Sequence, residues 1–187
     1  MKRNREETSL CIPKRPSNAL TGVRYLTREI KSTMESGFVV EMDDTNALQW
    51  NVYIPTDLIQ NNNEELARQL TSWSRKTGRD AAILLHIQFP SVYPKSVPFV
   101  RIIRPRFCFH TGHITIGGSI CTPLLTPSGW QSMTPLALLQ AVLVIWKEGN
   151  ATVQMKSDEH CYNPFIDYHE SEARDAFNRV AAHHGWV

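Results

Sequence analysis

Hydrophobic side chains recur along the chain with two different periods, and these periods predict a helix followed by strands. Between Ser17 and Ser36 apolar residues return every three or four positions, which is typical of an amphipathic helix. Four short β-prone runs come next, at 38–42, 48–54, 81–89 and 99–103. Asp, Asn and Pro residues between these runs favour turns, so we expect the strands to form an antiparallel meander.

The stretch from 60 to 80 interrupts this meander between the second and third strands. Leu66, Leu70 and Trp73 fall at helical spacing within a polar sequence, which predicts a short helix. The segment is therefore expected to be a surface insertion in one domain that spans 17–187.

Residues 106–130 show no periodic pattern. Glycine and proline punctuate the segment at Gly112, Gly117, Gly118, Pro123, Pro127 and Gly129. Loops of this length within a compact domain usually carry function. Reactive side chains are therefore most expected in this loop.

Two further helices are predicted after the loop. Thr134 can cap a helix that starts at Pro135 and runs to Gly149, and its nearly all-round apolar character predicts a central, buried position. A last amphipathic helix is expected from about Asp167 to His183. The element order is that of an α+β domain.

The N-terminal residues 1–16 carry basic clusters, two prolines and few apolar groups. Such a segment cannot offset the entropy lost on ordering, so we expect a flexible arm. It also lacks the continuous apolar stretch of a secretory signal.

Composition and charge narrow the classes of partner. The 187 residues include 20 Lys and Arg against 18 Asp and Glu, a net charge of +2, so we expect no nucleic-acid partner. The longest apolar runs, such as 141–146, are too short to span a bilayer, and no membrane partner is expected. The 4 cysteines include no C-x-x-C pair, which favours a reducing compartment, the cytoplasm or the nucleus.

Cys121 is the strongest candidate for a reactive group. It lies in the sequence GGSICTPLL, where two glycines permit unusual turns and allow another molecule to approach closely. A thiol presented in this way is a candidate nucleophile. The alternative is a cysteine packed between Ile120 and Leu124, since unreactive cysteines are among the most buried residues.

A metal site was weighed against this hypothesis. Cys108, His110, His113 and Cys121 are all residue types that ligate zinc, but their spacing matches no standard zinc motif. We therefore predict no metal. The remaining cysteines, Cys11 and Cys161, are expected to be structural, as is Cys108.

Several motifs taken together resemble the ubiquitin-conjugating (UBC) fold. They are Tyr93-Pro94 with Pro98 after it, the long loop with G-S-I-C at 118–121, Trp130, and a buried helix behind them. Three stretches resemble the divergent Q class within that family: VPFVRIIRP at 97–105, IGGSICTPLLTPSGW at 116–130, and the tail with CYN at 161–163 and Gly185-Trp186.

The resemblance implies an acyltransferase that works through a cysteine thioester. Cys121 would accept ubiquitin from a ubiquitin-activating enzyme and transfer it to amines, and also to hydroxyls, of protein substrates. No cofactor is implied, because ATP is used only by the upstream activating enzyme. The resemblance also implies a ubiquitin ligase as a partner, without specifying the ligase class. The expected oligomeric state is a monomer.

Three histidines are candidates for supporting roles. His113 falls where most family members carry the Asn of a His-Pro-Asn tripeptide, so it is a candidate oxyanion donor or a support of the loop. His160 follows Asp158 and Glu159 and is a candidate gate residue. His184 is a candidate base if the final helix folds back towards the loop.

Two alternatives belong to other functional classes. One is a catalytically silent UBC-fold scaffold that binds ubiquitin or a partner conjugating enzyme. The other is a hydrolase in which His113 or His160 activates Cys121. The hydrolase hypothesis accounts for two residues, whereas the UBC resemblance accounts for the order of all elements.

Overall fold

The computed structural model describes residues 18–158 and 163–186 of the chain. The expected arm at 1–16, Cys11, His160 and Cys161 lie outside the described residues. The division into an arm and one domain stays a prediction.

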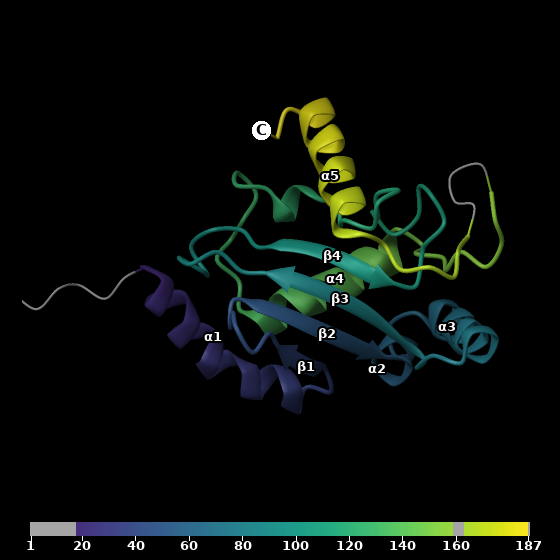
Figure 1. Cartoon of the computed structure of the whole chain (residues 1–187), viewed down its shortest axis with the longest axis horizontal. Coiled ribbons are helices and arrows are strands. Elements are labelled where there is room, and N and C mark those ends of the chain that lie inside the picture. Colours follow the sequence, from purple (N-terminus) through teal and green to yellow (C-terminus); the bar gives the residue numbers. More distant parts are fainter. Residues whose placement is uncertain (1–17, 159–162, 187) are drawn as a thin grey trace, which may run out of the picture.

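The predicted helix and meander are confirmed. Helix α1 covers Asn18–Glu35, and the four strands pair antiparallel in the order β1-β2-β3-β4 (Figure 1). The strands are β1 Val39–Met42, β2 Gln49–Pro55, β3 Ala82–Gln88 and β4 Phe99–Arg104. Every second side chain of β2 is buried, as the alternating sequence pattern predicts. Trp50, Val52 and Ile54 are each 0% exposed.

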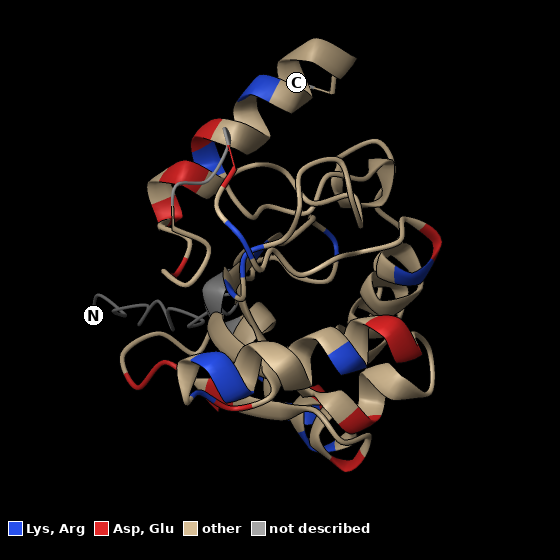
Figure 2. Ribbon diagram, turned by 90° about the vertical axis from the view of Figure 1, so that its right-hand side faces the viewer, with Lys and Arg blue, Asp and Glu red and all other residues tan. Residues whose placement is uncertain are grey.

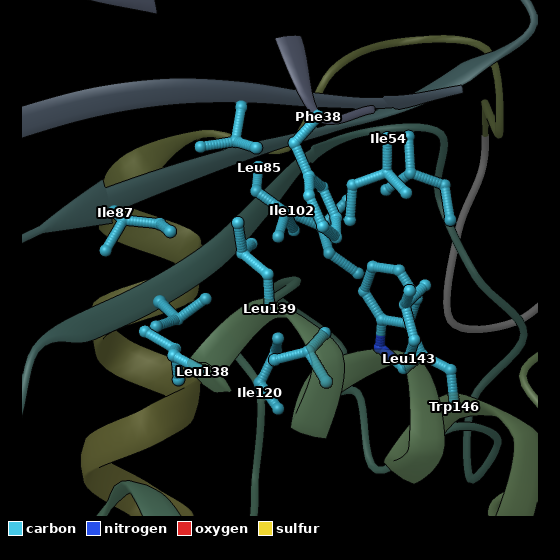
Figure 3. Packing of buried hydrophobic residues seen from close by; sticks show 14 of the residues in the cluster. Phe38, Ile54, Leu85, Ile87, Ile102, Ile120, Leu138, Leu139, Leu143 and Trp146 are labelled. Atoms are coloured by element: carbon cyan, nitrogen blue, oxygen red, sulfur yellow. The ribbon is translucent and has the colours of Figure 1, made fainter. Parts of the chain in front are cut away.

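Helix α4, Pro135–Glu148, packs against the inner face of the sheet. In Figure 3 Leu138, Leu139 and Trp146 point from this helix towards strand residues such as Ile87 and Ile102. The predicted start is confirmed, because the Thr134 side chain accepts from the N–H of Ala137 at 3.1 Å. The expectation of burial all round is only partly right, since Val144 on the opposite face is 48% exposed.

Two helices lie between β2 and β3. The short α2, Thr56–Gln60, was not predicted, whereas α3, Glu64–Thr77, contains the expected helix. Leu66, Leu70 and Trp73 are at most 1% exposed and belong to the main core, so the inner face of α3 is part of the domain interior. Whether 60–80 is an insertion stays a prediction.

The last helix, α5, covers Glu170–His184 and starts later than predicted. His169 begins it with a capping box: its ring accepts from Ser171, and the Glu172 carboxylate accepts from the His169 N–H at 2.6 Å. In Figure 1 α5 rises from the β4 side of the sheet. No helix in the described part of the chain combines the length and apolar character needed to cross a bilayer.

Candidate active site

A small hairpin within the long loop positions Cys121. Ile114 pairs with Ile120, and the Thr115 N–H donates to the Ser119 carbonyl at 2.9 Å. The Thr115 and Ser119 hydroxyls share a further bond of 2.7 Å inside the hairpin. At its open end the Cys121 N–H donates to the His113 carbonyl at 2.7 Å, so residues 113 and 121 lie side by side.

The hairpin is hydrogen-bonded to the edge of β4. The Ile120 N–H donates to the Val100 carbonyl at 3.2 Å, and the Ile102 N–H donates to the Gly118 carbonyl at 2.8 Å. A side chain held by a sheet edge is positioned better than one on an unpaired loop. The segment that looked aperiodic in sequence therefore holds Cys121 in a defined position.

The N-terminal part of the loop is attached to the end of α4. The Gly112 N–H donates to the Gly149 carbonyl at 2.7 Å, and the Thr152 N–H donates to the Thr111 hydroxyl at 3.2 Å. Gly112 has a φ of +63°, and a Cβ there would lie 2.5 Å from the Ala151 Cβ, so this approach requires glycine.

Cys121 opens onto a cavity of about 530 Å³ between the loop and α5. The cavity brings together Cys121, His113 and His184, three of the residues that the sequence singled out. Helix α5 thus folds back towards the loop. This was the condition under which His184 was a candidate base. His110, Arg179 and His183 also line the cavity, and sequence reasoning did not place them there.

Burial raises the pKa of the Cys121 thiol, which is partly exposed. The protonated thiol is thus the resting form at neutral pH, and a base must take its proton when it attacks. Burial likewise raises the pKa of Cys108, and the Asp158 charge adds to this effect. Cys108 is also partly exposed but lines a separate cavity with Gln154 and Asp158.

His113 holds a left-handed backbone conformation, with a φ of 54°. Its ring packs towards Gly149, where an added Cβ would lie 2.9 Å from the His113 Cδ2. The described residues offer this ring no hydrogen-bond partner, so it is the His113 carbonyl that supports the loop. The ring N–H groups can therefore serve a bound group.

The unusual turn expected at the two glycines of the loop is confirmed by the φ of +87° at Gly118, but the close approach that they allow differs from the one expected. A Cβ on Gly117 would lie 2.1 Å from the Glu172 carbonyl oxygen, and one on Gly118 would lie 2.6 Å from the Tyr168 ring. The close approach that they permit is made by this chain's own C-terminal segment rather than by another molecule.

Arg106 anchors that segment. Its buried guanidinium donates to the Ile166 and Asp167 carbonyls, each at 3.2 Å, and to the Glu172 carboxylate at 2.9 Å. It also lies 4.3 Å from the centre of the Tyr168 ring. One arginine therefore fixes the start of α5, the helix that forms a wall of the cavity.

Of the four residues weighed as zinc ligands, His110, His113 and Cys121 line one cavity, whereas Cys108 lines another. Within 18–158 and 163–186, no three His, Cys, Asp or Glu side chains form a group able to hold a metal ion. Cys108 and Cys121 line different cavities, which separates the two thiols of the motif.

Comparison with known proteins identifies relatives in one family. No protein-family model matches the chain. A Q-like ubiquitin-conjugating enzyme protein of Drosophila melanogaster is 26% identical over 164 residues, which are 84% of this chain and 48% of that protein. The human Q-like protein 1 of the ubiquitin-conjugating enzymes is 28% identical over 153 residues, 79% of this chain and 86% of that protein.

Similarity to solved structures is more distant. A ubiquitin-conjugating enzyme E2 from Plasmodium falciparum is 16% identical, with a TM-score of 0.47 over 65% of this chain and 95% of that one. The similarity to this family rests on the sequence relatives. The chain spans about half the length of the Drosophila protein. The chain is a divergent relative of the Q-class ubiquitin-conjugating enzymes.

Proposed function

We propose that this chain is an active ubiquitin-conjugating enzyme that carries ubiquitin as a thioester on Cys121. The observation that supports this most directly is the position of Cys121. The sheet edge holds this partly exposed thiol, and it borders a cavity lined by His113 and His184. The family of its relatives supplies the reaction class.

The proposed reaction has two acyl transfers. The Cys121 sulfur attacks the thioester carbonyl of the charged activating enzyme, a new C–S bond forms, and the activating enzyme's thiol leaves with the proton. An acceptor amine or hydroxyl then attacks the new thioester, a C–N or C–O bond forms as the C–S bond breaks, and the proton lost by the acceptor returns to the Cys121 sulfur. The thioester is already activated, so neither step needs ATP, a metal or an organic cofactor.

We assign supporting roles to two cavity histidines. The His113 ring donates to the oxyanion of the tetrahedral intermediate, since it has no other partner in the described residues. His184 accepts the proton of the attacking group, because its imidazole lines the same cavity as Cys121. His160, the proposed gate, lies outside the described residues.

The partners follow from this reaction. They are ubiquitin, a ubiquitin-activating enzyme, protein substrates, and a ubiquitin ligase whose class the reaction does not specify. The proposed state is a monomer, and the proposed location is the cytoplasm or the nucleus, where free thiols persist.

A charging assay tests the proposal. The protein, ubiquitin, a ubiquitin-activating enzyme and ATP should give a gel shift that reductant removes. Cys121→Ala should abolish the shift, whereas Cys108→Ser, a change of the other partly exposed thiol, should keep it. A shift that survives in Cys121→Ala would refute the site, and no shift with any ubiquitin-like modifier would favour the scaffold.

A second measurement tests the role of His113. His113→Ala should slow discharge of the thioester to an amine on the order of 100-fold, as expected when one oxyanion donor is lost. His113→Asn should recover part of the rate, because Asn keeps an N–H donor and tolerates positive φ. Both variants should melt within about 2 °C of the wild type, since a change below 1 kcal/mol moves the melting temperature by that little. Equal rates for Ala and Asn, or a large fall in melting temperature, would indicate a structural role.

A further inference from the structure

Four arginines near α5 pair with a carboxylate. Arg106 and Arg174 hold carboxylates, Glu172 at 2.9 Å and Glu170 at 2.8 Å. Arg79 and Arg104 both pair with Asp167, the latter at 3.2 Å. Each of these four therefore has a carboxylate partner, although Arg79 and Arg104 share one.

Arg179 differs from them. It is exposed and has no carboxylate within 4.0 Å in the described part of the chain, although Asp175 precedes it by one helical turn. In Figure 2 the acidic residues of α5 lie towards its N-terminal end, and the last charged position before the C-terminus is basic. Arg179 lies on the cavity that also contains Cys121.

The rest of the cavity lining, as far as the described residues go, carries no negative charge. Four histidines share it with Arg179, and none of the described lining residues is Asp or Glu. The remaining members are apolar or small, among them Phe109, Ile114, Thr115 and Val180. Apolar walls reduce screening by water, so an anion inside the cavity would interact strongly with the guanidinium.

Arg179 has the chemistry to recognise a carboxylate or a phosphate. Its planar fork can donate two parallel hydrogen bonds to such a group, and unlike histidine it is charged at every physiological pH. The cavity of about 530 Å³ falls within the range of small-ligand sites, so a side chain and its neighbour can enter together.

We propose that this cavity is an acceptor subsite that selects nucleophiles flanked by an acidic residue, with Arg179 as the residue that determines the preference. The inference rests on the proposed function, since the nucleophile is the group that attacks the Cys121 thioester. Because Cys121 and Arg179 border one cavity, the anion must lie within about one residue of the acceptor Lys or Ser.

Single-turnover discharge tests the preference. The protein is charged with ubiquitin, separated from the activating enzyme and ATP, and mixed with one of two peptides. The peptides differ only in having Asp or Asn on both sides of a single acceptor Lys. The Asp peptide should react about fivefold faster, as expected for one exposed ion pair of about 1 kcal/mol. The ratio should shrink at high salt, because the interaction is screened.

Arg179→Gln should bring the ratio of the two rates to about one, and Arg179→Lys should keep part of it, since Lys retains the charge but not the fork. Arg75→Gln, which removes an exposed arginine of α3 outside the cavity, should leave the ratio as in the wild type. A ratio that Arg179→Gln leaves unchanged would overturn the proposal, as would equal rates for the two peptides in the wild type.

Binding to the uncharged protein separates this inference from the proposed function. Titration with the Asp peptide should shift the backbone amide NMR signals of residues 179–184 and 110–121, while the Asn peptide should shift them far less. If the protein binds the Asp peptide in this way but is never charged, the proposed function fails and the anionic subsite stands. If charging succeeds and neither peptide shifts these signals, the subsite fails and the proposed function stands.

Discussion

Replacement of Arg106 by Met should destabilise the domain by about 3 kcal/mol, because it removes several charge-assisted hydrogen bonds, each worth roughly 1.5–3 kcal/mol. The side chain of Arg106 is only 7% exposed, and Met fills much of its volume. Met cannot replace the hydrogen bonds to two carbonyls and to Glu172, which hold the start of α5. For a domain of this size the melting temperature should fall by about 6–12 °C.

Amide hydrogen exchange should show where this stability is lost. The Tyr168 N–H, which donates to the Ile103 carbonyl at 2.8 Å, and the amides of α5 should exchange faster, while those of β2 and β3 should change least. Arg68→Met is the matched control, because Arg68 pairs with Glu65 on the surface and is 75% exposed. That change should cost at most about 0.5 kcal/mol. Equal losses in the two variants would show that Arg106 does not anchor α5.

Replacement of Gly117 by Ala should have an effect of similar size for a steric reason. The new Cβ would lie 2.1 Å from the carbonyl oxygen of Glu172 and 2.9 Å from the N of Ala173, and neither backbone atom can rotate away. Helix α5 must therefore shift, which should cost about 3 kcal/mol, the upper part of the usual range for overpacking. Thermal unfolding should show a melting temperature lower by about 6–12 °C.

The control for this variant is Gly78→Ala at the end of α3. Gly78 has a φ of +70°, and a Cβ there would meet no atom within 4 Å. Its replacement measures the backbone penalty alone, about 1 kcal/mol. If Gly117→Ala were no more destabilising than Gly78→Ala, the close packing of the hairpin against α5 would be wrong.

The helices and strands could be predicted from the sequence because their signals are local. The alternation of Trp50, Val52 and Ile54 with polar residues reports directly which side of β2 is buried. Thr134 followed by Pro135 likewise specifies the start of α4 through hydrogen bonds made within one turn. The start of α5 was placed too early because the cap is His169, a less usual capping residue.

Only part of the candidate site could be predicted from such local signals. Cys121 and His113 share one loop, so their neighbourhood could be expected from the sequence, although the hairpin and the bond between them could not. Arg179 and His183 reach the same cavity from a helix some sixty residues further on. The hydrophobic pattern of α5 does not indicate which surface of the domain the helix will pack against.

Local pattern therefore specified the elements other than α2, their order and the loop that carries the thiol. The tertiary structure decided what surrounds that thiol: Arg106 ties down α5, Gly117 lets it approach, and Arg179 then faces the cavity of Cys121. Hydrophobic periodicity indicates which face of a helix or strand is buried and which is exposed. This pattern involves only residues that are near one another in the sequence. The partners of a polar side chain depend instead on segments that meet only when the chain is folded, and no local period records them.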